Sequence, residues 1–386
     1  MIDGYDLNRD LAAINRALNG DMPEAAIFYC GRALEVTSAR AVSALNLDPG
    51  AQVFANLDML ERLSCISRPA LYLGHSLRRL ANDARHILRP LTGYDADFAA
   101  LCLGPWLQWY MTEYFRGPQS QVADRSFGIR SALATGAVAD TLELLNRAED
   151  QDVSDRLLTL VNDEVLKLPA LASMVAEVLI SDGRADDAQS VLKAALAHVP
   201  EDLRLNQLYA LGFRRAGHPE EALARLQTLT GKYSEDEETL GITAGALKSS
   251  WEKGQGPNDA LSRALKLYAK GFQVSRERNL YLGVNGAAIE LWQGNPRARE
   301  HGAHVADIFA KRNAQLAESG ISVDGQRDYY DMVTEAEALL LAGEGARARD
   351  LYASAFARFA ARKGDIEGTR TQANRSIALL GGEPIT

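Results

Sequence analysis

Arginine and histidine side chains gather on one face of the helix predicted over residues 69–89. At about 100° per residue, the apolar residues of this helix fall on one arc and the cationic residues on the opposite arc. The polar stripe consists of His75, Arg78, Arg79, Asn82, Arg85, His86 and Arg89. Such a stripe raises the local electrostatic potential and can attract an anion such as RNA or a nucleotide. It can equally be a solvated face, or pair with carboxylates of neighbouring helices such as Glu35, Asp58 or Glu61.

The residue order within this stripe resembles that of a known family. Residues 77–86, Leu-Arg-Arg-Leu-Ala-Asn-Asp-Ala-Arg-His, resemble the Arg…Gly-Asn-x-Ala-x-His signature of a bacterial helical domain. That domain belongs with the HEPN (higher eukaryotes and prokaryotes nucleotide-binding) proteins. Residues 30–35, Cys-Gly-Arg-Ala-Leu-Glu, are similar to its first helix. The resemblance covers about residues 23–115, with Ala81 where the family usually has Gly, and it implies a HEPN-like helical bundle.

The HEPN resemblance also implies a chemistry, the cleavage of RNA without a metal ion. Arg79 and His86 have six residues between them, which satisfies the family spacing for the Arg and His that line a cleft, often at a dimer interface. In that mechanism His86 is the general acid/base and Arg79 holds the phosphate charge. Arg78 aligns with the Arg of the signature, and Asn82 can orient the His86 ring. Many HEPN relatives are inactive and use the same helices to dimerise or to bind nucleotide, so a homodimer is allowed in either case.

Helical periodicity and helix breakers organise the first third of the chain. Strand signals are nearly absent, and turn clusters such as Asn19-Gly20 and Asp48-Pro49-Gly50 end the helical segments. The pattern predicts helices over 7–18, 23–45, 53–65, 69–89 and 95–115. A Gly-Pro-Gln-Ser stretch at 117–120 is the best linker candidate. We therefore predict an N-terminal helical bundle over residues 1–117.

A 34-residue period begins at about residue 169. The windows 169–202 and 203–236 share small residues at positions 8 and 20, large apolar residues at 11 and 24, and Gly at 15. The matching pairs are Ala176 and Ala210, Leu179 and Phe213, Gly183 and Gly217, Ala188 and Ala222, and Leu192 and Leu226. This pattern resembles the tetratricopeptide repeat (TPR). The small residues let the two helices of one hairpin approach closely, and the Gly makes the turn between them.

Further copies of the repeat continue toward the C-terminus. A clear copy begins at Tyr329, and looser copies begin near Glu237 and Leu280. We expect four to five stacked hairpins over 169–362, with a helix near 364–380 as a cap. The repeat array then covers 169–386, and 118–168 is a helical connection or a degenerate repeat. The predicted fold class is all-α, a helical bundle followed by a TPR-like α-solenoid.

Residues 279–299 carry a second resemblance. They are similar to the helical repeat region that flanks the kinase domain of apoptosis-signal kinases, the TRAF-binding region. The similar positions are Tyr281, Gly283, Asn285, Ala287 and Gly294. A divergent TPR copy requires the same small residues, so this segment is open to both interpretations.

The concave groove of the stacked hairpins is the second candidate site. Positions 2, 5, 9, 12 and 13 of the first helix of each hairpin line such a groove. In the second copy these positions are Arg204, Gln207, Leu211, Arg214 and Arg215. Because three of the five are arginines, we expect a protein or peptide partner of acidic character.

Composition and the absence of known motifs argue against several other classes of protein. The net charge of −9 and the pI of about 5.3 argue against a protein that coats nucleic acid along its length. The sequence holds no phosphate loop, nucleophile elbow or dinucleotide fingerprint, so no cofactor is predicted. His301 and His304 are spaced like two metal ligands, but no third ligand completes a metal site. No window approaches the roughly 18 consecutive apolar residues of a membrane span.

The three cysteines are odd in number and far apart, which indicates a protein of the reducing cytoplasm.

The sequence supports two functions from different classes. The first function is a TPR-type protein–protein interaction scaffold coupled to a helical N-terminal module, in a bacterial stress or defence pathway. The alternative is a HEPN-type, metal-independent ribonuclease that is regulated through its TPR array.

Overall fold

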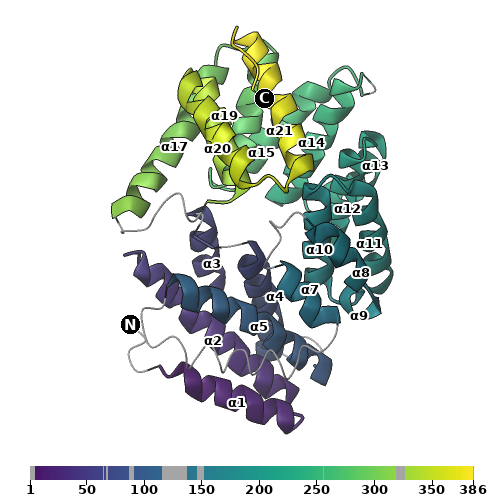
Figure 1. Cartoon of the computed structure of the whole chain (residues 1–386), viewed down its shortest axis with the longest axis vertical. Helices are drawn as coiled ribbons and strands as arrows, with labels where there is room; N and C mark the ends of the chain where they lie inside the picture. Colours follow the sequence, from purple (N-terminus) through teal and green to yellow (C-terminus); the bar gives the residue numbers. More distant parts are fainter. Residues whose placement is uncertain are drawn as a thin grey trace. The chain divides into compact units, whose positions relative to one another are not determined.

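The computed structural model describes residues 5–63, 65–66, 68–86, 91–114, 137–145, 152–254, 256–318 and 327–385. These residues form α-helices joined by turns, with no strand among them, so the all-α prediction is confirmed. The chain divides into two compact units (Figure 1). The first unit is 1–140 with 314–326, and the second is 141–313 with 327–386.

The first unit contains a bundle built around helix α2. Its helices are α1 (Leu7–Asn19), α2 (Pro23–Ala44), α3 (Val53–Arg62), α4 (Arg68–His86) and α5 (Gly93–Glu113). All five were predicted, with ends that differ by a few residues, and α5 continues through Pro105. Helix α2 packs against each of the other four. The N-terminal helical bundle is therefore present.

Small residues and one buried hydrogen bond explain why α2 is central. A Cβ atom on Gly31 would overlap the side chain of Ala81 in α4, so these two helices cross at close range. Trp106 of α5 is fully buried, and its indole N–H donates to the Thr37 hydroxyl of α2 over 2.8 Å. The hydrogen bond satisfies a polar group that burial would otherwise penalise.

Three short helices precede the repeats. They are α7 (Ala137–Leu145), α8 (Val153–Leu160) and α9 (Asp163–Leu166). Helices α8 and α9 pack against the first repeat helix. The linker predicted at 117–120 lies outside the described residues, so the boundary there and the connection over 118–168 stay predictions.

Five helical hairpins follow among the described residues, all in the second unit except the end of the fourth hairpin from residue 314 on. They are α10 (Pro169–Ser181) with α11 (Ala185–His198), α12 (Leu203–Arg215) with α13 (Pro219–Lys232), α14 (Glu237–Glu252) with α15 (Ala260–Val274), α16 (Leu280–Trp292) with α17 (Ala298–Glu318), and α19 (Tyr329–Ala342) with α20 (Gly345–Arg358). The first helix of each hairpin begins where the sequence copy begins. A last helix, α21 (Lys363–Leu379), completes the chain.

In four of the five hairpins the turn contains the predicted glycine. Gly183, Gly217 and Gly343 have φ angles of 88°, 88° and 94°. These values lie in the left-handed region, which an L-residue with a side chain adopts only at a cost. Gly294 takes the same role in the fourth hairpin, with a φ of 70°.

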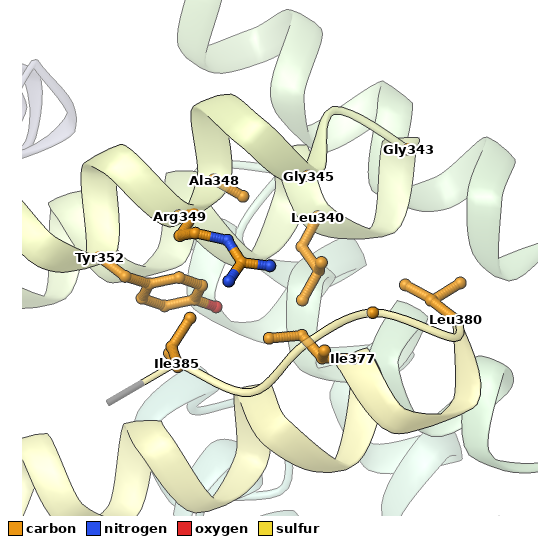
Figure 2. A pocket seen from close by; sticks show the side chains of 10 residues that line it. Leu340, Gly343, Gly345, Ala348, Arg349, Tyr352, Ile377, Leu380 and Ile385 are labelled. Atoms are coloured by element: carbon orange, nitrogen blue, oxygen red, sulfur yellow. The ribbon is translucent and has the colours of Figure 1, made fainter.

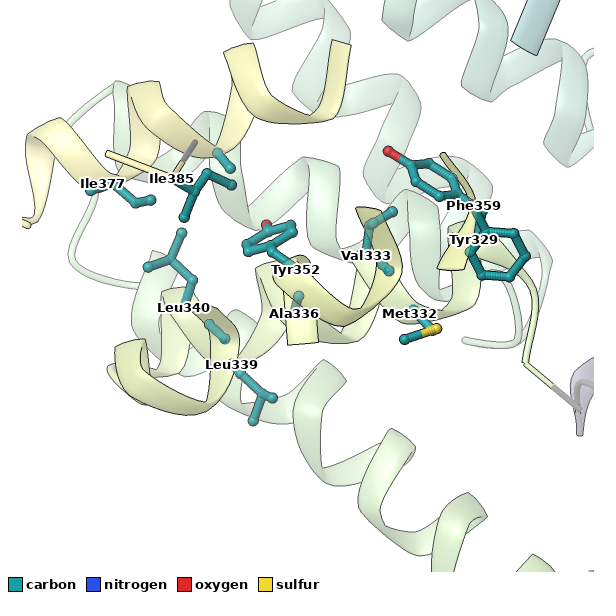
Figure 3. Packing of buried hydrophobic residues seen from close by; sticks show 13 residues of the cluster. Tyr329, Met332, Val333, Ala336, Leu339, Leu340, Tyr352, Phe359, Ile377 and Ile385 are labelled. Carbon is teal, nitrogen blue, oxygen red and sulfur yellow. The ribbon is translucent and has the colours of Figure 1, made fainter. Parts of the chain in front are cut away.

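Small and large residues fill the hairpins as the repeat pattern requires. The small residue at position 8 is buried in all five copies, as Ala176, Ala210, Ala244, Ala287 and Ala336. The large residue of the second helix is buried as Leu192, Leu226, Tyr268 and Tyr352. Figure 3 shows this packing in the last hairpin, where Tyr352 and Leu340 meet Ile377 of α21 and Ile385.

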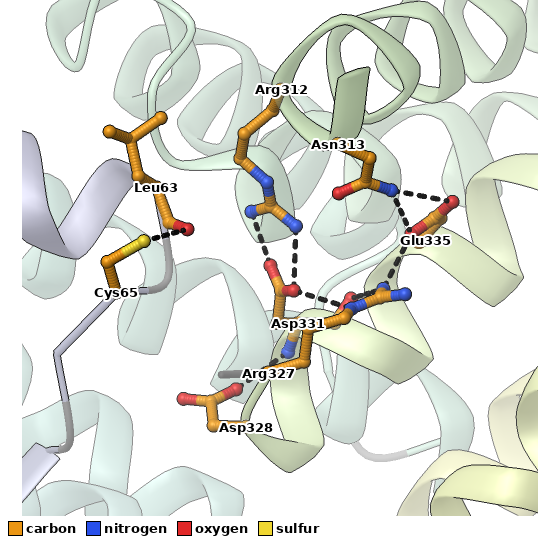
Figure 4. Close-up of polar contacts among 8 residues, drawn as sticks. All are labelled: Leu63, Cys65, Arg312, Asn313, Arg327, Asp328, Asp331 and Glu335. Carbon is orange, nitrogen blue, oxygen red and sulfur yellow. Dashed lines mark hydrogen bonds and ion pairs between the residues drawn. The ribbon is translucent and has the colours of Figure 1, made fainter. Parts of the chain in front are cut away.

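Charged side chains join α17 to α19 (Figure 4). Arg312 binds both carboxylate oxygens of Asp331, over 2.5 and 2.7 Å. Arg327 binds Asp331 over 2.9 Å and Glu335 over 2.5 Å. All four side chains are 10% exposed or less. Each buried charge has an opposite charge as its neighbour, which is what burial of charge requires.

Helix α21 returns along the first helices of the hairpins. It contacts α19 and α16, and it also contacts α10 of the first hairpin. Figure 1 shows this yellow helix beside the second unit's teal and green helices. The chain's own last helix therefore lies against the face that is predicted to form the groove.

Candidate functional site

The first residue of the predicted groove, Arg204, links three consecutive hairpins. Its guanidinium binds Glu177 of α10 over 2.6 Å and Glu238 of α14 over 2.7 Å. The Arg204 side chain is 20% exposed. A cation between two carboxylates holds neighbouring hairpins in register. Arg204 thus has structural partners within the solenoid.

Gln207 and Leu211 lie on the same face of α12 but differ in surroundings. The Gln207 amide donates to Asp236 over 2.7 Å and to the hydroxyl of Thr239 over 2.9 Å. Asp236 caps the N-terminus of α14, so Gln207 fixes the start of the next hairpin. Leu211 packs against the apolar residues between α12 and α14.

Arg215 holds the carboxylate of Asp365, which belongs to α21. The two side chains are 2.8 Å apart, and Arg215 also donates to the Gly364 carbonyl over 3.2 Å. The Tyr330 hydroxyl donates to the same carboxylate over 2.5 Å. Burial by itself would raise the pKa of Asp365, but Arg215 and Arg362 outweigh it and hold that pKa below its usual value. Asp365 is therefore a buried carboxylate that stays charged.

Arg214, the neighbour of Arg215, is an arginine of the predicted groove positions without a carboxylate partner among the described residues. Its guanidinium makes no ion pair or hydrogen bond with any described residue, and its Nε is buried. Gly245 of α14 provides the space for it, since a Cβ there would lie 2.8 Å from the guanidinium and 3.5 Å from the Tyr268 hydroxyl. The Tyr268 side chain is fully buried beside it. In the described part of the chain, Arg214 thus has an aromatic hydroxyl, and no carboxylate, close to its guanidinium.

Lys248 of α14 stands at a predicted groove position that the sequence analysis did not name. It is 6% exposed, and its ammonium binds Asn285 over 3.0 Å and also Gln372 of α21. Burial lowers the pKa of Lys248 to about 8, and Glu252 and Glu337 offset that effect only in part. Lys248 stands at position 12 of the third copy, the same position that Arg214 has in the second. The repeat offsets therefore contained the signal for it.

The same offsets also select groove residues in the last hairpin. Positions 2 and 9 of the copy that begins at Tyr329 are Tyr330 and Glu337. Tyr330 binds Asp365, and Glu337 accepts from Gln372 over 2.7 Å. Position 13 of the first copy is Ser181, which accepts a hydrogen bond from Arg362 over 3.1 Å. Groove positions from separate hairpins thus converge on α21 and on the residue just before it.

The basic face of α4 has mixed surroundings. Arg79 and Asn82 are exposed, whereas Arg78 is half-buried with its guanidinium 5.5 Å from the Phe54 ring centre. Neither Arg78 nor Arg79 makes an ion pair with a described residue. Arg85 binds Glu35 over 2.7 Å. This is the pairing with a carboxylate of a neighbouring helix that the sequence analysis gave as the alternative to an anion site. His86 is a residue of α4, but its side chain lies outside the described residues.

The remaining histidine candidates have partners or are neutral. Burial, together with the nearby charges of Arg78 and Arg79, lowers the pKa of His75 to about 4, so His75 is neutral at pH 7. His301 binds Glu290 over 2.6 Å, and His304 binds Glu277 over 3.0 Å. The two histidines considered as a metal pair therefore each contact a separate carboxylate.

One small cavity lies where α19 and α20 meet the C-terminal segment (Figure 2). Its volume is about 260 Å³. Its walls are mostly apolar, including Leu340, Ile377 and Ile385, and Arg349 is its charged residue. None of the residues predicted for the groove or for the basic face of α4 lines this cavity.

The comparison with protein families agrees with the repeat assignment. Residues 184–290 match the family described as Tetratricopeptide Repeats-Sensor (TPR-S). This range covers all of α11 to α15 and most of α16. This segment of the chain is therefore similar to tetratricopeptide repeats. No match was found among curated proteins. No helix among the described residues has the length and apolar character to cross a membrane.

Three solved structures are similar over nearly the whole chain. Human IFIT1, solved as a dimer with m7Gppp-AAAA, is 12% identical, with 98% of this chain and 91% of that chain covered and a TM-score of 0.40. A Rap protein complexed with Competence and Sporulation Factor is 12% identical, with 97% and 98% covered and a TM-score of 0.37. The APC/C hetero-tetramer Cut9-Hcn1 is 14% identical, with 98% and 80% covered and a TM-score of 0.39.

Proposed function

We propose that this protein is an interaction scaffold whose TPR solenoid binds a protein or peptide of acidic character in its concave groove. One observation carries the proposal: Arg215 binds a carboxylate, that of Asp365, which comes from outside the hairpins. Arg214 next to it makes no ion pair with a described residue and can take a second carboxylate. The groove thus combines a demonstrated carboxylate contact with an unused cation.

Charge reversal at Arg214 tests this function. The tagged full-length protein and its Arg214→Glu variant are used to capture partners from cells that express it, with quantitative mass spectrometry as the readout. We expect the partner to be lost from Arg214→Glu and retained by Arg263→Glu, which changes an exposed residue of α15. Capture that is unchanged by Arg214→Glu contradicts an acidic partner in this groove.

The proposal includes two further parts, a HEPN-like N-terminal module and a location in the cytoplasm. The three cysteines Cys30, Cys65 and Cys102 are buried free thiols, a state that a reducing cytoplasm maintains. The resemblance of residues 23–115 to a bacterial HEPN-like domain favours a bacterial stress or defence pathway. In this scheme the module couples the captured partner to a response.

A second function is favoured by the two arginines of α4. Arg78 and Arg79 are consecutive, and neither makes an ion pair with a described residue. Two cations without carboxylates suit a phosphate anion. The alternative is therefore a metal-independent ribonuclease in which Arg79 holds the phosphate and His86 is the acid/base, with Arg78 and Asn82 in support and a homodimer cleft as an option.

Incubation with labelled RNA in the presence of a chelator separates the two functions. If the module is a ribonuclease, the full-length protein cleaves RNA, and Arg79→Ala and His86→Ala abolish the cleavage. His218→Ala, which changes an exposed histidine between α12 and α13, serves as the matched control. Intact RNA with the wild-type protein, alone and with its captured partner, rejects the ribonuclease and leaves the scaffold.

A further inference from the structure

The last helix, α21, lies in the groove like a bound ligand. It contacts α10, α16 and α19, so it spans the solenoid from the first hairpin to the last. Side chains at groove positions of four hairpins make direct contacts with it: Arg215, Lys248, Trp292, Tyr330 and Glu337. A simple end cap needs contacts with the last hairpin alone. The reach of α21 across the groove requires another explanation.

The start of α21 is recognised by charge and by close approach. Asp365 in its first turn accepts from Arg215 over 2.8 Å and from Tyr330 over 2.5 Å. Gly364, just before it, lies against Gly183 of the first hairpin, because a Cβ on Gly364 would be 2.6 Å from the Gly183 Cα. A small residue followed by a carboxylate is therefore what this end of the groove accepts.

The middle of α21 is recognised through an amide. Gln372 donates to Glu337 over 2.7 Å and accepts from Lys248. It lies seven residues after Asp365, hence on the same face of the helix two turns later. Its neighbour Arg375 lies about 5 Å from the ring centres of both Trp251 and Trp292 and 3.3 Å from Glu252.

These contacts are polar and directional, in contrast to the packing between hairpins. The apolar residues of α21 in the buried core, Ala373 and Ile377, face the last hairpin. Toward α12 and α14 the helix presents Asp365, Gln372 and Arg375 instead. Hydrogen bonds and ion pairs add modest net stability but select strongly for partner chemistry. The groove therefore recognises a helix through its polar side chains.

We infer that α21 occupies the place of the partner, and that the partner displaces it with a helix of matching chemistry. That helix carries a small residue and a carboxylate in its first turn and an amide seven residues after the carboxylate. Arg215 and Tyr330 take the carboxylate, and Lys248 and Glu337 take the amide. This inference rests on the proposed function, since it assumes that the partner binds in the concave groove.

The test uses a labelled peptide of residues 360–386 and full-length chains. In the Asp365→Arg chain, Arg215 repels the chain's own α21 and the groove opens. We expect this chain to bind the peptide at least about tenfold more tightly than the wild-type chain, measured by fluorescence anisotropy. Glu367→Arg makes the same charge change on the same helix at a side chain that is 73% exposed, and we expect it to bind like the wild type.

Two further measurements keep the inference open to refutation. Circular dichroism and hydrogen exchange of α10 to α16 check that Asp365→Arg is folded, and Gln372→Lys, which opposes Lys248, replaces it if it is not. A folded variant that binds the peptide no better than wild type overturns the inference. So does a peptide that binds equally well after its own Asp365→Arg change.

The outcomes also separate this inference from the proposed function. If the folded Asp365→Arg chain binds the peptide but no partner is lost from Arg214→Glu, the groove reads helices and the proposed acidic partner fails. If a partner depends on Arg214 but is captured equally by wild-type and Asp365→Arg chains, the scaffold function stands. In that case α21 is not displaced by the partner, and the inference fails.

Discussion

Gly364 and Gly183 touch backbone to backbone, although they stand at opposite ends of the repeat array. A Cβ on Gly364 would lie 2.6 Å from the Cα and 2.7 Å from the amide nitrogen of Gly183. Atoms at that distance overlap, so neither helix can keep its place once a side chain is added. This contact sets how closely α21 approaches the turn between α10 and α11.

The first prediction concerns that contact. We expect Gly364→Ala to lower the free energy of unfolding by about 1–3 kcal/mol, as overpacking does, and to speed hydrogen exchange in α21. Gly345→Ala is the control, because no atom lies within 4 Å of a Cβ there. Chemical denaturation compares the two variants. Equal stability of Gly364→Ala and wild type would show that α21 adjusts freely.

The second prediction concerns the ion pair of Asp365 with Arg215. Asp365→Ala leaves Arg215 and Arg362 without their shared buried carboxylate, and we expect a loss of about 3 kcal/mol, at the lower end for a buried pair because Arg215 is 21% exposed. The double variant Arg215→Ala, Asp365→Ala is expected to lose less than the sum of the two single changes. Thermal and denaturant unfolding of all three give the coupling energy. Strict additivity would mean that the two side chains do not interact.

The third prediction follows from the lowered pKa of Lys248. Its pKa is about 8 in the folded protein against 10.5 for the ordinary side chain. Between these values the unfolded chain binds more protons, so this group adds stability as the pH rises from 7 to 9.5. We expect the difference in unfolding free energy between wild type and Lys248→Met to shift in favour of wild type over that range. A difference that is flat with pH would assign Lys248 an ordinary pKa.

The fourth prediction concerns the charges between α17 and α19. Asp331→Ala leaves Arg312 and Arg327 buried without their common carboxylate, and we expect a loss of about 3–5 kcal/mol. Asp307→Ala removes an exposed carboxylate that binds Lys311 four residues later. That pair is expected to contribute under about 1 kcal/mol. Similar losses of unfolding free energy in both variants would contradict the conclusion that the buried ion pairs matter more for stability than the exposed one.

Local patterns in the sequence predicted most of the fold. The helix ends of the first unit and the hairpins from α10 to α20 follow from periodicity, and Gly183, Gly217 and Gly343 mark their turns. Each of these features depends on residues a few positions apart. A 3.6-residue helical period and a 34-residue repeat period are both readable in a single chain.

The contents of the groove were only partly predictable. Arg214 and Arg215 were found from the repeat offsets, and the same offsets point to Lys248, Tyr330 and Glu337. Asp365 belongs to no copy of the repeat, and 150 positions separate it from Arg215. Periodicity contains no information on contacts at that separation, so the return of α21 appears only in three dimensions. On α4, the sequence analysis named Glu35 among the possible partners of the basic face, and the structure shows that Arg85 is the residue that pairs with it.

The contact of α21 with α10 changes the expected unfolding of the repeat array. In an open row of hairpins each hairpin is stabilised by its immediate neighbours, and the outermost hairpins unfold first. Here the first hairpin and the last both pack against α21. Neither end can unravel without losing contacts with α21 that also stabilise the other end. The array is therefore expected to unfold cooperatively, so a substitution that destabilises the first hairpin also destabilises the last one.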